Sequence, residues 1–342
     1  MFTRRGLING ALGAGAGFAF AARDTQWAAA QTSAAQIERN KAVIHRFKDA
    51  MGTKEEDAIM REIAPNIKRV RVGMENLNVN ARDQGFPSAG PGLRTAFPDR
   101  NDMIEDMIAE GDMVAMKYRS RGTHAGNFNG IPPTGKKYDI QNFALFRLAD
   151  GKITEAWFMT DEAGLLLTLG AKLPARKDGK LMPPPITGVG EDPDVVIKRL
   201  EAGPLTTLED RNRLLVARSK GSAPFGRENY TADFKQLRVG FQHLRDYGER
   251  TKTGTQNLTA ATEERHDRIE NLIAEGDKVV MRFRVVAVNT KPLYGLPPTD
   301  KRIEVAEVGL FRIADGKIKE AFYYGDELGL LLQLGIVNAV IG

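Results

Sequence analysis

The residue types in this sequence favour proton-transfer chemistry over cysteine or metal chemistry. Cysteine is absent, which excludes disulfides, zinc–thiolate sites, iron–sulfur clusters and cysteine nucleophiles. The four histidines include no pair at helical ligand spacing, so we expect no metal site. His124 has the intrinsic pKa that suits proton transfer near neutral pH, although a loop histidine bonded to the backbone is the structural alternative.

Two further polar residues interrupt apolar stretches that are predicted to be strands. Asn142 alternates with Ile140, Ala144 and Phe146, so its amide would be buried and would need hydrogen-bond partners. Glu307 takes the same place later in the chain. Each is a candidate for binding a substrate oxygen, and an internal hydrogen bond is the alternative.

The elements that must position these residues occur twice. Residues 104–170 align without gaps with residues 269–335, and about half of the positions are identical. The repeated blocks include Ile104–Asp112 and Ile269–Asp277, Phe146–Ile153 and Phe311–Ile318, and Asp161–Gly170 and Asp326–Gly335. A repeat of this length indicates a duplicated domain, not a solenoid.

The rest of the chain is divided accordingly. Residues 1–35 contain Arg4 and Arg5 before an uncharged Ala- and Gly-rich run, which is typical of a twin-arginine export signal and predicts a periplasmic protein. An ordinary secretory signal is the alternative. Unit one is expected over residues 36–170 and unit two over residues 195–342. Residues 171–194, rich in Pro and Gly, form the predicted linker.

Each unit has helices first and strands afterwards. In unit one, helical spacing predicts helices over residues 36–50 and 54–63, and a short helix over 162–169 that ends at Gly170. Strands are predicted over residues 103–109, 113–121, 138–148 and 152–159. This order indicates an α+β domain, not a doubly wound one.

The repeated motifs resemble those of the SnoaL-like polyketide cyclase (ester cyclase) family. The similarity is carried by Thr123–Lys136, Phe146–Ile153 and Asp161–Gly170, with Ala96–Asp99 before the first long strand. It implies the fold of the nuclear transport factor 2-like superfamily: two tandem cone-shaped α+β barrels, each a curved antiparallel sheet packed on N-terminal helices, forming a pseudo-dimer. It also implies a pocket between sheet and helices, and no cofactor.

The resemblance assigns acid/base roles to two aspartates. By motif, Asp161 and Asp326 correspond to the residue that serves as general acid/base in the polyketide cyclases. A carboxylate in an apolar pocket has a raised pKa, and Trp157 and Met159 would supply such walls for Asp161, as Tyr324 would for Asp326. The alternative is a helix N-cap, whose backbone hydrogen bonds would lower the pKa.

His124 occupies the family's Thr-His-x-Gly position, and its counterpart in unit two is Asn289. We therefore expect unit one to keep more of the polar pocket. The function expected is a cofactor-independent cyclase, isomerase, dehydratase or aldol-type lyase acting on a small hydrophobic, oxygenated molecule. A non-catalytic periplasmic module that binds a small molecule or a protein is the alternative.

The expected partners follow from charge and hydropathy. Lys and Arg number 49 against 44 Asp and Glu, an excess too small to favour nucleic-acid binding. No membrane span is expected once the signal is removed. The pseudo-dimer lies within one chain, and further association into a homo-oligomer is left open.

Overall fold

The computed structural model describes residues 33–72, 93–128, 131–170, 190–240, 249, 258–293 and 295–335. Nearly all of the predicted export signal (residues 1–35) and linker (residues 171–194) lies outside the described residues, and both stay predictions. None of the described helices is long and apolar enough to span a membrane.

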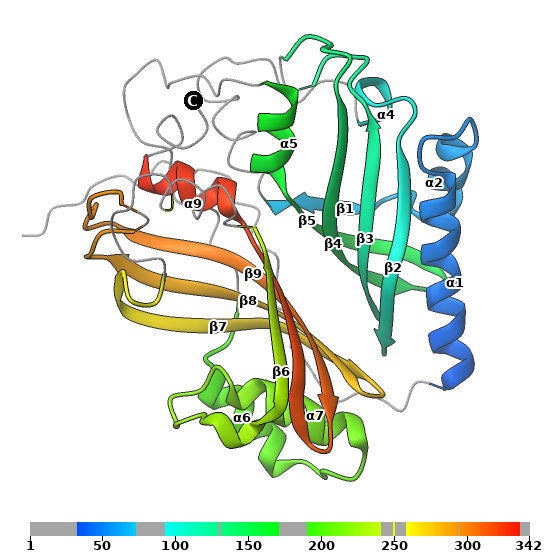
Figure 1. The fold of residues 1–342 in the computed structure, drawn as a ribbon. Coiled ribbons are helices and arrows are strands. Elements are labelled where there is room, and N and C mark those ends of the chain that lie inside the picture. The colour runs from blue at the N-terminus through cyan, green and yellow to red at the C-terminus, as the bar shows by residue number, and fades with distance from the viewer. Residues whose placement is uncertain are drawn as a thin grey trace, which may run out of the picture.

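Unit one begins with helices that are followed by a sheet (Figure 1). The elements are α1 (Ala34–Ala50), α2 (Glu56–Ile63), β1 (Lys68–Arg71), α4 (Leu93–Ala96), β2 (Asn101–Glu110), β3 (Met113–Thr123), β4 (Lys137–Ala149), β5 (Lys152–Thr160) and α5 (Glu162–Leu169). Helix α5 has the predicted bounds because Asp161 caps its start and Gly170, at φ +75°, ends it in the left-handed region that glycine tolerates.

Unit two repeats this order. Its elements are α6 (Pro193–Ala202), α7 (Leu208–Arg218), the short 3-10 helix η1 (Arg227–Asn229), β6 (Tyr230–Val239), β7 (Thr262–Glu275), β8 (Lys278–Asn289), β9 (Arg302–Ala314), β10 (Lys317–Gly325) and α9 (Glu327–Leu334). Helix α6 starts two residues inside the expected linker because Asp192 caps it and Pro193 suits the first helical turn.

The two sheets have the same topology. Their strand orders are β1-β5-β4-β3-β2 and β6-β10-β9-β8-β7. The α+β fold in two tandem units is confirmed. The sheets, however, are mixed and not purely antiparallel, because β1 runs parallel to β5 and β6 runs parallel to β10. The short strand β1, whose four residues offer little pattern, was not predicted.

One face of each sheet packs on helices. In unit one, Ile44 and Phe47 of α1 pack with Met116, Phe146 and other apolar residues of the sheet. Helix α7 lies against β7 and β8 of unit two in the same way (Figure 1). We call the sheet face that carries helices the interior face of each unit.

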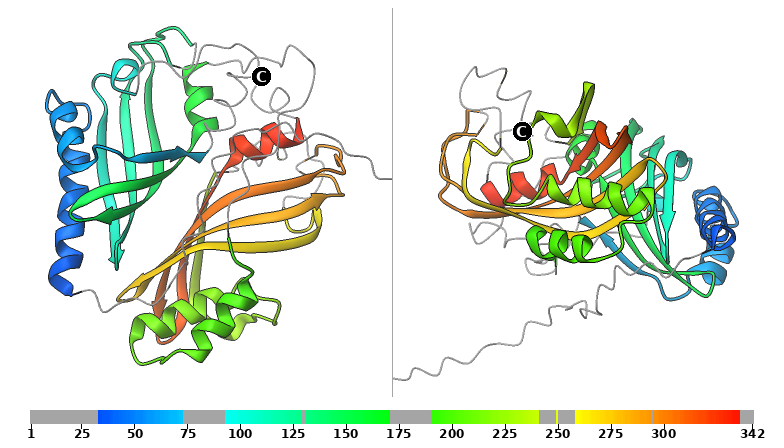
Figure 2. Two further views of the ribbon diagram at one scale, coloured as in Figure 1. Left: turned by 180° about the vertical axis from the view of Figure 1, so that it is seen from behind. Right: turned by 90° about the horizontal axis from the view of Figure 1, so that it is seen from below.

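The opposite faces of the two sheets pack on one another (Figure 2). This apolar interface contains residues of both units: Ile108, Met113, Ala115, Phe143, Leu145, Trp157 and Met159 from unit one, and Ile273, Val280, Ala306, Val308, Leu310 and Tyr324 from unit two. Strand alternation explains the division, since successive side chains of a strand point to opposite faces. The two units therefore share a hydrophobic core.

Two glutamates lock the interface reciprocally. Oε2 of Glu275 accepts a hydrogen bond from the backbone N–H of Ala109 at 2.8 Å, and Oε2 of Glu110 accepts one from Ala274 at 2.7 Å. Glu110 also pairs with Arg213, and Glu275 with Lys41 at 2.5 Å. Each glutamate thus satisfies an edge-strand N–H and a cation, and both of these partners belong to the other unit.

We expect Glu110→Ala to lower the free energy of unfolding by about 1–3 kcal/mol, because it leaves the N–H of Ala274 and the Arg213 guanidinium without this partner. Glu275→Ala should act similarly. Glu105→Ala is the control, because its ion pairs with Lys117 and Arg119 are more exposed, and it should cost less than about 1 kcal/mol. Equal losses in urea unfolding for Glu110→Ala and Glu105→Ala would contradict the role of the lock.

Candidate functional site

A buried ion pair lies at the interior face of unit one. Nζ of Lys48, in the last turn of α1, is 2.7 Å from Oδ2 of Asp102 on β2, and the two side chains are 3% and 4% exposed. The ammonium also lies 3.5 Å from the centroid of the Tyr118 ring on β3. Cation–π attraction adds to the ion pair.

The environment shifts the protonation of all three residues. Burial lowers the pKa of Lys48 to about 8, although the Asp102 carboxylate opposes this. Burial alone would raise the pKa of Asp102, but the charges of Lys48 and Arg100 hold it below its usual value. Burial, together with the Asp102 charge, raises the pKa of Tyr118. Lys48 is therefore a cation close to its titration point near neutral pH.

Two hydroxyl groups complete the surroundings of Asp102. The Ser120 hydroxyl donates to Oδ1 of Asp102 at 2.6 Å, and the Tyr138 hydroxyl lies 3.2 Å from Ser120 Oγ. Nε of Arg100 is 3.7 Å from Oδ1 of the same carboxylate, too far for a hydrogen bond. Tyr138 in turn packs edge-on against Phe97. Aromatic rings therefore lie next to these polar groups.

A second carboxylate reaches this interior from the start of α5. Glu162 is 1% exposed and forms a bidentate ion pair with Arg71 of β1, with Nη2 at 2.9 Å from Oε2. Burial raises the pKa of Glu162 to about 7, against the opposing charge of Arg71. The Arg71 guanidinium carbon lies 5.9 Å from the Phe128 ring centroid. Glu162 can therefore exchange a proton near neutral pH in an apolar setting.

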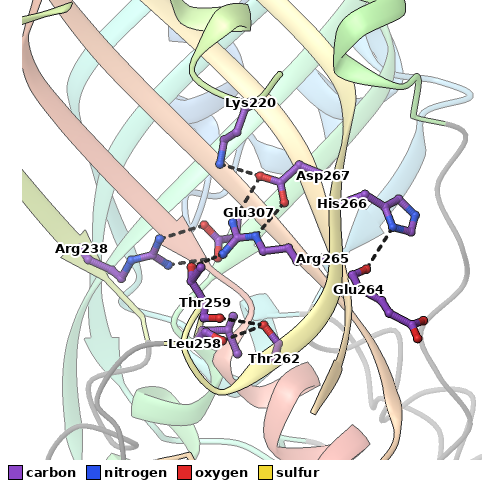
Figure 3. A network of polar contacts seen from close by, with 10 residues as sticks. All are labelled: Lys220, Arg238, Leu258, Thr259, Thr262, Glu264, Arg265, His266, Asp267 and Glu307. Atoms are coloured by element: carbon purple, nitrogen blue, oxygen red, sulfur yellow. Dashed lines mark hydrogen bonds and ion pairs between the residues drawn. The ribbon is translucent and has the colours of Figure 1, made fainter. Parts of the chain in front are cut away.

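Unit two contains the equivalent lysine–aspartate pair (Figure 3). Nζ of Lys220 is 2.9 Å from Oδ2 of Asp267, and it lies 3.6 Å from the centroid of the Phe283 ring. Burial lowers the pKa of Lys220, as it does for Lys48. The duplicated chain has thus kept a buried lysine, an aspartate and an aromatic ring in both interiors.

The remaining cations of unit two are paired differently. Arg265 contacts both oxygens of Asp267, at 3.2 and 3.3 Å. Arg238, the counterpart of Arg71, binds Glu307 of β9 through two hydrogen bonds of 3.0 and 3.1 Å. Glu307, predicted to bind substrate, therefore neutralises an arginine (Figure 3).

The two aspartates assigned by the family motif are helix caps. Oδ1 of Asp161 accepts the N–H of Gly164, and Oδ1 of Asp326 accepts the N–H of Gly329, each at 2.9 Å. Burial nevertheless raises the pKa of Asp326 to about 6, despite the Gly329 hydrogen bond and the Arg284 charge. Asp326 is thus both a cap and a perturbed carboxyl group.

Tyr324 of unit two contacts unit one across the interface. Its hydroxyl donates to the backbone carbonyl of Gln141 in unit one. Burial raises the pKa of Tyr324 well above its ordinary value, and the nearby charges of Asp161 and Glu162 add to the shift. The N-terminal ends of α5 and α9 therefore meet at this junction (Figure 1).

His124 is fully buried and ties down a loop. Its Nδ1 accepts the backbone N–H of Thr134 at 3.3 Å and lies 3.0 Å from the Thr134 hydroxyl. In unit two, Oδ1 of Asn289 accepts the same two bonds from Thr299. Burial lowers the pKa of His124, which favours the neutral ring. Its ring centroid is 5.5 Å from that of Phe97, and no described hydrogen bond joins it to Asp161.

The other predicted binding residues are divided between the two sheet faces. Asn142 is buried on the interior face, and its Nδ2 donates to the carbonyl of Ile140 at 3.2 Å. Trp157, Met159 and Tyr324 lie in the interface core instead, because α1 and α2 cover the other face of the sheet. Their predicted contact with substrate stays a prediction.

Four buried side chains of this interior were not predicted from the sequence: Lys48, Asp102, Arg100 and Glu162. A signal was present, since Arg100-x-Asp102 recurs as Arg265-x-Asp267, just before the longest repeated block. Glu162 stands beside Asp161 in a motif that recurs as well. Lys48 carried a weaker signal, since Arg39-Asn40 and Lys48 recur at an offset of 172 as Arg211-Asn212 and Lys220. Among the described residues, no cluster of three or more His, Asp or Glu could hold a metal ion.

Fold and interior together define a duplicated α+β protein in which each unit has a five-stranded mixed sheet and buried ionisable groups. The sequence profile of the SnoaL-like polyketide cyclase family matches residues 41–169 and 233–334. The chain therefore belongs to the SnoaL-like polyketide cyclase family, with one member domain in each unit.

Its relatives include two named cyclases. The chain is 31% identical over 103 residues to the aklanonic acid methyl ester cyclase DauD of Streptomyces sp. (strain C5), covering 30% of this chain and 64% of that protein. It is 28% identical over 134 residues to the aklanonic acid methyl ester cyclase DnrD of Streptomyces peucetius, covering 39% of this chain and 91% of that protein.

Solved structures with similarity include a putative SnoaL-like polyketide cyclase from Jannaschia sp. CCS1 (24% identity, TM-score 0.34, 42% of this chain and 99% of that chain). Another is IdmH, a putative polyketide cyclase from Streptomyces antibioticus (28% identity, TM-score 0.31, 39% and 99%).

Proposed function

We propose that this chain is a cofactor-independent enzyme of the cyclase type that acts on a small, largely apolar, oxygenated molecule at the interior of unit one. The observation that carries the proposal is Glu162, a buried carboxyl group whose pKa is raised to about 7. General acid/base catalysis is most effective when the pKa of the group lies near the working pH. Arg71 holds the carboxylate in place.

The chemistry proposed is an intramolecular aldol closure. Ionised Glu162 takes a proton from a carbon next to a carbonyl, and the resulting enolate carbon attacks a second carbonyl of the same molecule. A new carbon–carbon bond forms, and the alkoxide receives the proton back. Substrate and product are isomers, so no oxidant or cofactor enters the balance. Isomerisation, dehydration and retro-aldol cleavage begin with related proton transfers.

Asp161, Asp326 and His124 stay candidates for the second proton transfer. Asp326 is supported by its raised pKa, and Asp161 by its place beside the Tyr324 phenol. The capping hydrogen bonds of both aspartates count against them, because these bonds favour the ionised form and occupy an oxygen. For His124, the loop-fixing bonds to Thr134 favour a structural role.

The first test uses aklanonic acid methyl ester, the compound in the names of both relatives. We expect liquid chromatography with mass spectrometry to detect a product of unchanged mass and altered retention. Glu162→Gln should reduce kcat by about 10²–10⁴-fold, and the wild-type kcat should rise as pH increases through about 7. Glu155→Gln, on the same unit but outside this interior, is the control. Full activity of Glu162→Gln would remove Glu162 from the mechanism.

The second candidate function is a non-catalytic module that binds a hydrophobic small molecule. Its specific support is that both motif aspartates are engaged as helix caps. Under this alternative, mass spectrometry would find an unchanged ligand retained by the purified protein. Turnover of a retained ligand would contradict it.

A further inference from the structure

Unit one contains a buried arginine with an unused hydrogen-bond donor. The Arg100 side chain is 7% exposed, and its Nε is buried without a hydrogen-bond partner. Its counterpart in unit two, Arg265, donates Nε to Oδ1 of Asp267 at 3.2 Å. Leaving a buried charged donor unsatisfied is costly, and such exceptions in folded proteins call for an explanation.

The difference between the units has an identifiable cause. In unit one the Ser120 hydroxyl occupies Oδ1 of Asp102, the oxygen that its counterpart offers to Arg265 in unit two. The residue of unit two at the position of Ser120 is Val285, which has no hydroxyl group to compete. Lys48 occupies the other oxygen of Asp102. Both oxygens of Asp102 thus have a partner, while Nε of Arg100 stays 3.7 Å from Oδ1 without a hydrogen bond.

A second cation, Arg69, lies at the edge of this interior. The Arg69 guanidinium carbon is 5.7 Å from the Phe47 ring centroid and 5.9 Å from that of Phe158. The residue is exposed as a whole, and within the described part of the chain it forms no ion pair. Burial lowers the pKa of Arg69, and the charge of Arg100 adds to the shift. Unit two has Gln236 in its place.

These cations stand among aromatic rings and hydroxyl groups. The Tyr138 hydroxyl lies 3.2 Å from the Ser120 hydroxyl, which donates to the Asp102 oxygen that faces Arg100. Phe97 packs edge-on against Tyr138 with ring centroids 4.8 Å apart. Aromatic rings beside an arginine N–H that has no hydrogen-bond partner suit an aromatic molecule that carries an anionic oxygen group.

We infer that unit one recognises a carboxylate on its substrate through Arg100, assisted by Arg69, and so prefers a free acid to the corresponding methyl ester. The inference rests on the proposed function only for the class of substrate. It distinguishes this chain from a cyclase that takes a neutral ester, because an ester carries no negative charge to satisfy the two guanidinium groups. A charge-assisted hydrogen bond in a desolvated setting favours the acid by about 10- to 100-fold.

The experiment compares the binding of two probes, aklanonic acid and its methyl ester, by titration calorimetry with the full chain. We expect the acid to bind about 10- to 100-fold more tightly to the wild type. Arg100→Gln should remove this preference. Ser120→Val should also remove it, because Oδ1 of Asp102 becomes free to accept from Arg100, as Asp267 accepts from Arg265. Ser120→Val keeps the arginine, so it can test the inference even if Arg100→Gln does not fold.

Arg265→Gln is the matched control and should keep the preference for the acid. The inference is overturned if the wild type does not bind the acid, if it binds both probes equally, or if Arg100→Gln keeps the preference. Turnover is measured separately. Tight binding of the acid without turnover would support the inference and count against the proposed enzyme. Turnover of the ester without preference for the acid would do the reverse.

Discussion

Replacing Asp102 with alanine is expected to lower the free energy of unfolding by about 3–5 kcal/mol at neutral pH. The substitution leaves the Lys48 ammonium buried and without its carboxylate, which lies 2.7 Å away in the native protein. The face of the Tyr118 ring still contacts the ammonium and offsets part of the loss. We therefore expect a loss near the lower end of this range of unfolding free energy. Urea unfolding monitored by circular dichroism measures the change.

The double variant Lys48→Met with Asp102→Leu separates the cost of an unpaired charge from the value of the pair. Removing both charges and restoring apolar volume should return most of the stability, since buried ion pairs seldom exceed a hydrophobic replacement. Asp267→Ala is the parallel case in unit two and should cost at least as much, because Lys220 and Arg265 both lose their carboxylate. A loss below about 1 kcal/mol for Asp102→Ala would mean that Lys48 is solvated.

The second large effect is a dependence of stability on pH through Glu162. Its pKa of about 7 in the folded protein exceeds the ordinary value of 4.5. Between these values the folded chain keeps a proton that the unfolded chain releases. This contribution is therefore complete below about pH 4.5 and is lost as pH rises through about 7. Asp326 acts in the same direction, between 3.8 and about 6.

Glu162→Gln isolates this contribution, since glutamine fills similar space and can accept a bond from Arg71 but does not titrate. We expect the variant to gain stability relative to the wild type, by roughly 2–3 kcal/mol, as pH rises from about 5 to about 8. Glu105→Gln should show no such trend, because Arg119 and Lys117 help to keep the pKa of Glu105 low. Parallel stability curves for Glu162→Gln and wild type would contradict the raised pKa.

The fold could be predicted from sequence because its signals are local and repeated. The turn at Gly111, with φ +60°, and the glycine cap at Gly170 fix element ends through backbone conformations that glycine tolerates. The parallel strand β1 could not be found in this way. Strand β1 pairs with β5, which lies far away in the sequence; Lys68, for example, pairs with Glu155. The four residues of β1 do not indicate that distant partner.

The site was less accessible to sequence reasoning. Motif similarity led to Asp161 and His124, but the motif does not distinguish a catalytic group from a cap or a loop anchor. The buried pair of Lys48 and Asp102 depends on contact between a helix and a strand far apart in sequence. From sequence, a lysine at the end of an amphipathic helix is normally predicted to be exposed to solvent. Its burial becomes visible only in the packed structure.

The joining of both units in one polypeptide has a consequence for how the interiors can differ. In a symmetric homodimer, every substitution occurs twice, so the two sites remain identical. In this chain, Ser120 can differ from Val285, and Asn142 from Glu307, because each residue is encoded separately and belongs to only one unit. Covalent connection also keeps the shared interface formed at any dilution. One half can thus change its interior residues while the other keeps the pairing of Asp267 with Lys220 and Arg265.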